Sequence, residues 1–116
     1  MTLQIVGLNH KTAPVEIREK VIFSGKDIDR ALKSVVSLPG VDEAIILSTC
    51  NRTEFYIIAE DSSSEKLHQW LINEKKLGPA FENSIFIRSN DAAIRHLFRV
   101  ACGLDSMVLG EAQILG

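Results

Sequence analysis

The sequence has 116 residues, of which 46% are hydrophobic and 24% charged, with a formal net charge of −2 and two cysteines. Its apolar stretches are too short for a membrane-spanning helix, which needs about 20 residues, and its start lacks the basic and apolar regions of a secretory signal. We therefore expect one cytoplasmic domain over residues 1–116, without a disulfide framework or a global positive charge, so that any contact with RNA is local.

The spacing of apolar and turn-forming residues predicts a mixture of strands and helices. Apolar side chains at i, i+3, i+4 and i+7 indicate helices, and short apolar runs bounded by polar turns indicate strands. The expected elements, in chain order, are a strand at 3–8, a short helix after Pro14, a helix at 26–38, strands at 43–48 and 53–59, a helix from about Ser62 to Leu77, a strand at 84–88 and a helix capped by the segment 89–91.

This order of elements favours an α+β fold. A four-stranded, mostly antiparallel sheet with helices on one face fits it, and a ferredoxin-like β-α-β-β-α-β sandwich is the simplest such arrangement. In that topology the strands at 43–48 and 53–59 form a hairpin. The sequence ends in an apolar, small-residue stretch at 110–116, which we interpret as a helix in progress in a fragment of a longer protein.

Local patterns make specific predictions for the last two helices. Ser62 and Glu65 stand at the spacing of a capping box, in which each side chain binds the backbone N–H of the other residue. The final helix carries an apolar stripe, which Cys102 follows, so we expect that cysteine in the core. The members of the stripe are Ile94, Leu97, Phe98 and Ala101.

The expected hairpin turn, with the sequence STCNRT over residues 48–53, carries more chemistry than a turn needs. A thiol attacks as the thiolate. Arg52 could stabilise that anion, or it could clamp the carboxylate of a substrate through two parallel hydrogen bonds. Asn51 and the neighbouring hydroxyls are neutral donors for a developing oxyanion. The alternative is that Cys50 is a small structural residue, and the local pattern favours neither interpretation over the other.

Other residue types in the sequence give weaker indications of function. His96 falls at the edge of the apolar stripe, beside Ala93 and Val100, where a histidine is more often packed and hydrogen-bonded than a general acid or base. No two histidines or cysteines stand at the spacing of a metal site, so we expect no metal. Trp70 and the phenylalanines are expected in the core, because no aromatic pair stands at alternating strand positions in a basic setting.

Three stretches of the sequence carry a resemblance to a known family. They are GLNHKTAP at 7–14, STCNRTE at 48–54 and GLDSMVLGEAQILG at 103–116. Together, and in this order, they closely resemble the N-terminal catalytic domain of glutamyl-tRNA reductase. The resemblance implies that Cys50 attacks the ester of glutamyl-tRNA to form a glutamyl thioester. The whole enzyme then reduces this thioester with NADPH to glutamate-1-semialdehyde, in the first step of tetrapyrrole (porphyrin and haem) biosynthesis.

The resemblance also implies roles for individual residues and partners. Arg52 pairs with the glutamate carboxylate and rejects glutamine, and His96 lies near the thiol and is linked to activity. The other positions implied to line the glutamyl pocket are Thr49, Asn51, Ser106, Glu111, Ala112 and Gln113. The family's NADPH-binding domain and its C-terminal dimerisation domain are absent from this sequence. A further implied partner is the glutamate-1-semialdehyde aminomutase that takes the product.

Two other classes of function compete with this interpretation. A noncatalytic, ferredoxin-like RNA-binding or regulatory module would need no reactive thiol, but the weakly acidic composition and the lack of stacking aromatics argue against it. An independent cysteine hydrolase for small esters would turn over without tRNA and would need a histidine in contact with the thiol.

Overall fold

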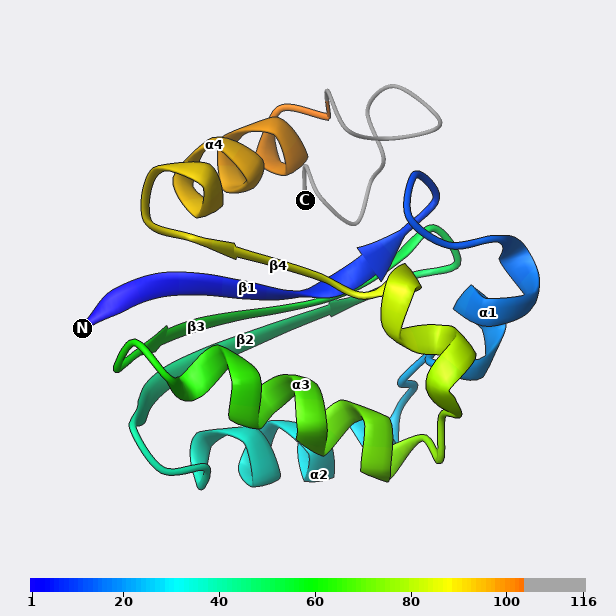
Figure 1. Cartoon of the computed structure of the whole chain (residues 1–116), viewed down its shortest axis with the longest axis horizontal. Helices are drawn as coiled ribbons and strands as arrows, with labels where there is room; N and C mark the ends of the chain where they lie inside the picture. The colour runs from blue at the N-terminus through cyan, green and yellow to red at the C-terminus, as the bar shows by residue number, and fades with distance from the viewer. Residues whose placement is uncertain (104–116) are drawn as a thin grey trace.

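A computed structural model describes residues 1–103 of the chain, which form a four-stranded sheet with helices on both faces (Figure 1). The elements are β1 (Thr2–Asn9), α1 (Val15–Lys20), α2 (Lys26–Val36), β2 (Val41–Ser48), β3 (Arg52–Ala59), α3 (Ser63–Glu74), the 3-10 helix η1 (Pro79–Ser84), β4 (Phe86–Ser89) and α4 (Asn90–Ala101). The strand order is β2-β3-β1-β4, and every neighbouring pair is antiparallel. The predicted fold class is therefore confirmed.

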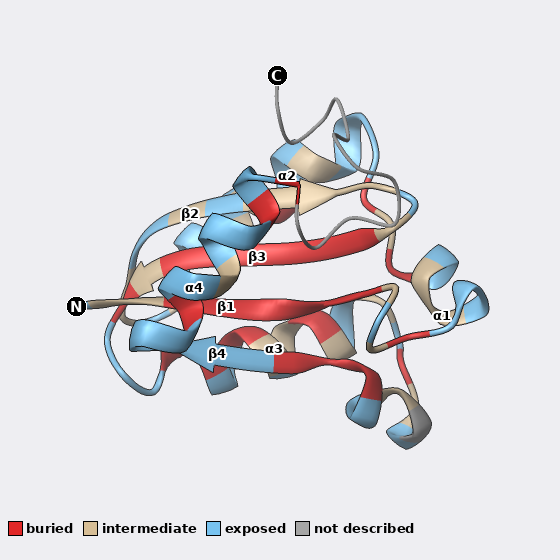
Figure 2. Ribbon diagram, turned by 90° about the horizontal axis from the view of Figure 1, so that it is seen from above, coloured by how far each residue is buried: buried red, intermediate tan, exposed pale blue. Residues whose placement is uncertain are grey.

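The predicted placement of the helices on one face of the sheet is correct for α2 and α3 and wrong for α4. Helices α2 and α3 lie together on one face of the sheet, whereas α4 lies on the opposite face, against β1 and β4 (Figure 1). The central strands β1 and β3 are buried along most of their length, and the edge strands β2 and β4 are more exposed (Figure 2). Within residues 1–103, no helix is long and apolar enough to cross a membrane.

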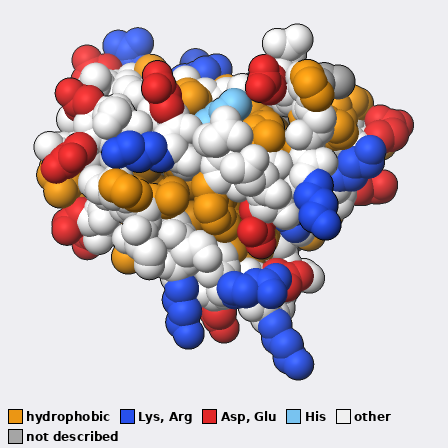
Figure 3. Space-filling model, turned by 60° about the horizontal axis from the view of Figure 1, so that its bottom comes forward, with side chains coloured by type: hydrophobic (Ala, Val, Ile, Leu, Met, Phe, Trp, Pro, Cys, Tyr) orange, Lys and Arg blue, Asp and Glu red, His pale blue; other side chains and the backbone are white. Residues whose placement is uncertain are grey.

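The main core lies between the sheet and the layer of α2 and α3. Alternate residues of β3, including Phe55 and Ile57, point into this layer and are fully buried. The rings of Phe23, Phe55 and Trp70 pack together with centroid separations of 5.7 to 6.1 Å. These aromatic residues therefore serve packing, as the sequence predicts. The outer surface of the helical layer carries charged side chains of both signs (Figure 3).

The N-terminus of α3 is capped by a distant strand and not by its own sequence. Ser62 occupies the N-cap position without a side-chain cap hydrogen bond, so the predicted capping box with Glu65 is wrong. The backbone of Ser62 is already helical (φ −84°, ψ 0°), whereas a capping serine usually has an extended backbone. The buried Gln4 of β1 takes over this role, because its Oε1 accepts a hydrogen bond from Ser64 N at 3.0 Å.

The last helix buries a different side from the one that its apolar spacing suggests. Ile94, Leu97 and Phe98 are exposed, and the helix instead buries Ala93 and Val100. The small side chain of Ala93 lets α4 approach the sheet closely. Ala101, the fourth member of the stripe, is exposed as well. Cys102 is also exposed, so its predicted place in the core is wrong: the helix ends at Ala101, and Cys102 is its C-cap residue.

We predict that Gln4→Leu lowers the free energy of unfolding by about 3 kcal/mol, because buried backbone groups would lose their partners. Besides capping α3, the Nε2 of Gln4 donates to Ala59 O at 3.1 Å and to Glu60 O at 2.9 Å. Urea unfolding of the chain measures the change. Gln69→Leu on the exposed side of α3 is the matched control, and it should change stability by less than about 0.5 kcal/mol. Equal losses in the two variants would contradict the capping role.

Candidate active site

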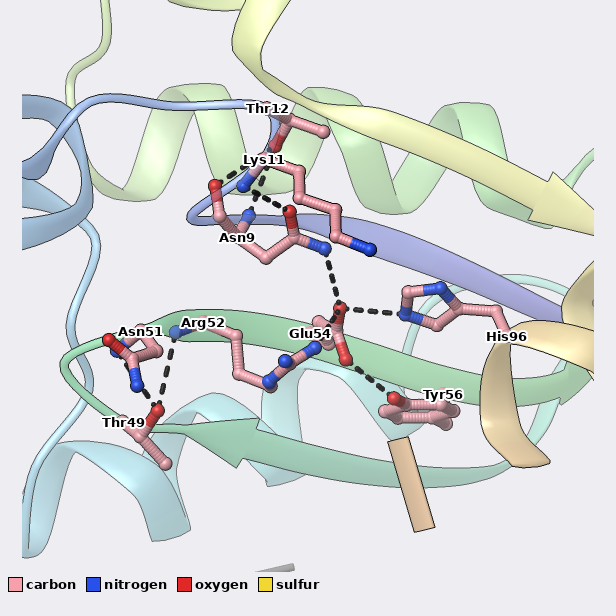
Figure 4. Close-up of polar contacts among 9 residues, drawn as sticks. All are labelled: Asn9, Lys11, Thr12, Thr49, Asn51, Arg52, Glu54, Tyr56 and His96. Carbon is pink, nitrogen blue, oxygen red and sulfur yellow. Dashed lines mark hydrogen bonds and ion pairs between the residues drawn. The ribbon is translucent and has the colours of Figure 1, made fainter. Parts of the chain in front are cut away.

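The hairpin between β2 and β3 presents Cys50 at its tip. Thr49 N donates to Arg52 O at 2.7 Å, which closes the turn. The hydroxyl of Thr49 accepts hydrogen bonds from the backbone amides of Asn51 and Arg52 at 3.1 and 3.2 Å (Figure 4). The turn is therefore held by its own threonine. The Cys50 thiol is free and exposed, so a molecule in solution can reach it.

The base of the hairpin is fastened to the segment before α2. Phe23 N donates to Ser48 Oγ at 2.9 Å, and Thr53 Oγ1 donates to Val21 O at 3.3 Å. The two hydroxyls also lie 3.1 Å from each other. The hydroxyls of Ser48 and Thr53, which the sequence suggests as donors to an oxyanion, thus fix the hairpin in place.

A buried carboxylate, that of Glu54, organises the polar residues between the sheet and α4. Its Oε2 lies 3.2 Å from Arg52 Nη1, 2.8 Å from His96 Nε2 and 3.4 Å from Asn9 Nδ2 (Figure 4). Its Oε1 accepts a hydrogen bond from the hydroxyl of Tyr56 at 2.5 Å. We call these five residues, Asn9, Arg52, Glu54, Tyr56 and His96, the Glu54 cluster. Arg52 and Glu54 are fully buried, and 13% of the His96 side chain is exposed.

The partners of Glu54 determine its charge. Burial by itself would raise the pKa of this carboxyl group, because it disfavours the charged form. The hydrogen bond and positive charge of His96, the hydrogen bond from Tyr56 and the charge of Arg52 outweigh burial and hold the pKa of Glu54 below its ordinary value. The carboxylate is therefore ionised at neutral pH. It can orient the imidazole and the guanidinium at the same time.

The period of β3 explains how the sequence builds the Glu54 cluster. Successive side chains of a strand point to opposite faces, so Arg52, Glu54 and Tyr56 share the face toward α4. Opposite Glu54 in the register lies Gly7, where an added Cβ would meet Thr53 O at 2.5 Å and Glu54 Cα at 2.8 Å. Glu54 and Asn9 are not among the site residues predicted from the sequence. The alternation of polar side chains at 52, 54 and 56 is the pattern from which a role for Glu54 could be predicted.

The structure brings some of the predicted site residues together and leaves others apart. Arg52 and His96 meet through Glu54, and the turn with Cys50 lies at the other end of the Arg52–Glu54 pair from His96 (Figure 4). No hydrogen bond joins the thiol to His96 in the described part of the chain. Within that part, no group of three or more His, Cys, Asp or Glu side chains could hold a metal ion. Four predicted pocket positions lie outside the described residues: Ser106, Glu111, Ala112 and Gln113.

Comparisons with known proteins all point to one family. Residues 6–116 match the sequence profile of the N-terminal domain of glutamyl-tRNA reductase. The glutamyl-tRNA reductase of Xylella fastidiosa (strain M12) is 54% identical to the chain over 116 residues, which cover 100% of this chain and 26% of that protein. The reductase of Pseudoalteromonas atlantica is 52% identical over 118 residues, covering 100% of this chain and 28% of the relative.

A solved structure is similar over the same region. The glutamyl-tRNA reductase from Methanopyrus kandleri matches with a TM-score of 0.76 and 36% sequence identity, over 97% of this chain and 25% of that chain. The chain therefore spans about a quarter of the length of the proteins that it matches.

We predict that Glu54→Gln lowers the free energy of unfolding at neutral pH by about 3 kcal/mol, because the buried guanidinium of Arg52 would lose the charge that faces it. The pKa of Glu54 is lowered on folding, so its carboxylate stabilises the fold above the ordinary value of 4.5 and loses this effect as the pH falls below it. The gap in stability between the wild type and Glu54→Gln should therefore shrink from about pH 6 to about pH 3.

Denaturant unfolding over this pH range measures the gap. Glu65→Gln, at an exposed position of α3, is the matched control and should give a gap near zero at each pH. A gap for Glu54→Gln that does not change with pH would contradict the assigned ionisation.

Proposed function

Because this chain belongs to the glutamyl-tRNA reductase family, we propose that it is the part of such an enzyme that accepts the glutamyl group of glutamyl-tRNA on Cys50. The observation that carries the proposal is the exposed thiol at the tip of a hairpin whose base is fastened. The next charged side chain on that hairpin, Arg52, is buried against Glu54. An accessible nucleophile thus stands two residues before a fixed cation on the same hairpin.

The proposed step transfers an acyl group from oxygen to sulfur. The Sγ of Cys50, as a thiolate, attacks the carbonyl carbon of the ester, so that a carbon–sulfur bond forms and the bond to the ribose oxygen breaks. The proton that the thiol loses is balanced by the proton that the ribose hydroxyl gains, and the tRNA leaves. A thiolate is a strong nucleophile and a good leaving group, so the thioester keeps its reactivity toward a second acceptor.

Arg52 supplies recognition of the substrate in this proposal. A guanidinium has several N–H donors in a fixed plane and can hold a carboxylate through two parallel hydrogen bonds. In this structure Nη1 of Arg52 donates a hydrogen bond to Oε2 of Glu54. We propose that Glu54 holds the guanidinium in place and that the side-chain carboxylate of the glutamyl group binds the same guanidinium as a second carboxylate. Glutamine would leave the buried charge of Arg52 without this second carboxylate, so it would bind more weakly.

His96 acts together with Glu54 in the same proposal. The hydrogen bond of 2.8 Å between His96 Nε2 and Glu54 Oε2 fixes the plane and the position of the imidazole. His96 thus lines the approach to the site, whereas an independent cysteine hydrolase would need it in contact with the thiol. Thr49 shapes the turn that carries Cys50, and Asn51 lies beside the thiol in that turn.

The remaining steps belong to the whole protein. Reduction of the thioester needs a hydride donor, which we propose is NADPH. Dinucleotide-binding folds use parallel strands with a glycine-rich turn before a helix, whereas each neighbouring pair of strands described here is antiparallel. We therefore place the cofactor on another part of the full-length protein. The family resemblance also supports a homodimer formed through a C-terminal domain, contact with the aminomutase that takes the product, and a cytoplasmic location.

We predict that the chain forms a glutamyl adduct on Cys50 when it is incubated with glutamyl-tRNA and quenched in acid. Cys50→Ser should form none, because a serine hydroxyl is hardly ionised at neutral pH and is therefore a poor nucleophile. Mass spectrometry of the intact chain detects the adduct. Cys102→Ser is the matched control: it removes the other exposed free thiol and should keep full acylation. A wild-type chain that is folded but gains no adduct would remove the enzymatic proposal and favour a noncatalytic module.

We predict that Arg52→Lys lowers the rate of Cys50 acylation and the selectivity for glutamyl-tRNA over glutaminyl-tRNA, each by at least about 10-fold, because a point charge cannot reproduce the planar fork. Single-turnover acylation with each aminoacyl-tRNA measures both effects. Arg30→Lys on α2 is the control, since Arg30 is exposed and pairs only with the exposed Asp27 at 3.0 Å. Unchanged selectivity in a folded Arg52→Lys variant would refute the role of Arg52.

A further inference from the structure

A groove of about 320 Å³ lies beside the Glu54 cluster, on the face of the sheet that α4 covers. Its floor comes from β4, one wall from α4 and the other wall from the loop that follows β1. We call it the basic groove. The described residues that line it are Asn9, Lys11, Thr12, Phe86, Arg88, Ala92, Arg95, His96 and Arg99.

Regular spacing brings the basic side chains into this groove. On α4, Ala92, Arg95 and Arg99 follow one another at helical spacing, so they share one side of the helix. On β4, Arg88 pairs with Ile5 and Phe86 with Gly7, which places both β4 side chains on the sheet face that carries Glu54. The two arginines of the helix and the arginine of the strand therefore line the same groove.

The basic groove has one sign of charge. Lys11, Arg88, Arg95 and Arg99 line it, and no Asp or Glu does so among the described residues. Within residues 1–103, Arg95 and Arg99 have no carboxylate within ion-pair distance, in contrast to Arg30 with Asp27 on the opposite layer. The chain as a whole has a net charge of −2, so this local charge is not a consequence of composition. Arginines that have no carboxylate partner among the described residues, such as Arg95 and Arg99, can attract an anion to the groove.

The basic groove leads directly to the proposed site. His96 lines the groove and also bonds Glu54 Oε2 at 2.8 Å, and Glu54 in turn holds Arg52. Figure 4 shows the Lys11 side chain on the same side of Glu54 as the imidazole. A polyanion in the groove would therefore have one end close to the residues that are proposed to handle the glutamyl group.

We propose that the basic groove binds the phosphate backbone at the acceptor end of the substrate tRNA. This inference rests on the proposed function, because a tRNA that delivers its ester to Cys50 must pass phosphates close to the Glu54 cluster. Planar arginine forks suit phosphate oxygens. The ring of Phe86 lies under the Arg88 guanidinium at 4.9 Å and beside the His96 ring at 5.1 Å, so protein groups already cover it. The groove is therefore expected to contact the phosphates of the tRNA and not its base edges.

The test replaces Arg95 and Arg99 together by glutamine in the full-length protein that carries this domain. Binding of uncharged tRNA is measured by fluorescence anisotropy from about 50 to about 200 mM salt. We expect about 10-fold weaker binding at low salt, and a dependence of log K on log salt that is shallower by about 1 to 2, since each lost phosphate contact removes close to one unit. Acylation of Cys50 by 4-nitrophenyl acetate, which has no phosphate, should be unchanged.

Two matched variants control for folding and for total charge. Arg30→Gln with Lys33→Gln removes the same charge from α2, on the opposite layer, and should leave tRNA binding unchanged. Arg95→Lys with Arg99→Lys keeps the charge in the groove and should keep the salt dependence of the wild type.

The outcomes separate this inference from the proposed function. Unchanged tRNA affinity and salt dependence in the glutamine variant, together with a wild-type adduct on Cys50, would overturn the inference alone. Equally weakened tRNA binding in the α2 variant would overturn the inference too. So would a glutamine variant in which only the KM for NADPH changes. Weaker tRNA binding in the glutamine variant, with no adduct in the wild type, would support the groove and reject the proposed acyl transfer.

Discussion

The geometry of the site depends on one buried carboxylate. Removing Glu54 from water carries a desolvation penalty of several kcal/mol, which is compensated only because a guanidinium, an imidazole and a phenol all meet its two oxygens. Each of these partners comes to a fixed position through that contact. Arg52 and Tyr56 reach it from β3, and His96 reaches it from α4. The ionised carboxylate therefore ties α4 to the sheet through His96, next to the apolar contacts of Ala93.

The two faces of β3 carry different kinds of side chains. Because side chains alternate along a strand, β3 points Phe55 and Ile57 into the apolar layer of α2 and α3, and Arg52 and Glu54 toward α4. The apolar side holds the strands in place through close packing. The face toward α4 combines the buried charged groups with a smaller apolar cluster of Ile5, Tyr56, Phe86 and Ala93. The hairpin tip with Cys50 stands at the end of this divided sheet.

Features that depend on near neighbours could be predicted from the sequence, and those that depend on distant partners could not. The hairpin and the fold class follow from local spacing and turn composition, whereas the exposure of Cys50, which the local pattern left open, is known only from the structure. The importance of Glu54 depends on the absence of a side chain at Gly7, opposite it in the register, and on His96 from another element. The exposure of the apolar stripe on α4 has the same cause, since Ala93 packs on the sheet and His96 bonds Glu54 in its place.

Helix α3 shows what such distant contacts mean for how the chain acquires its structure. Its first turn is satisfied by Gln4, 60 positions earlier, and Ser62 supplies no cap of its own. A 12-residue helix without a local cap is marginal in water. During synthesis of the protein, α3 would therefore become stable only after β1 has paired with β3 and β4. Helix and sheet are then expected to appear, and to melt, as a single cooperative unit.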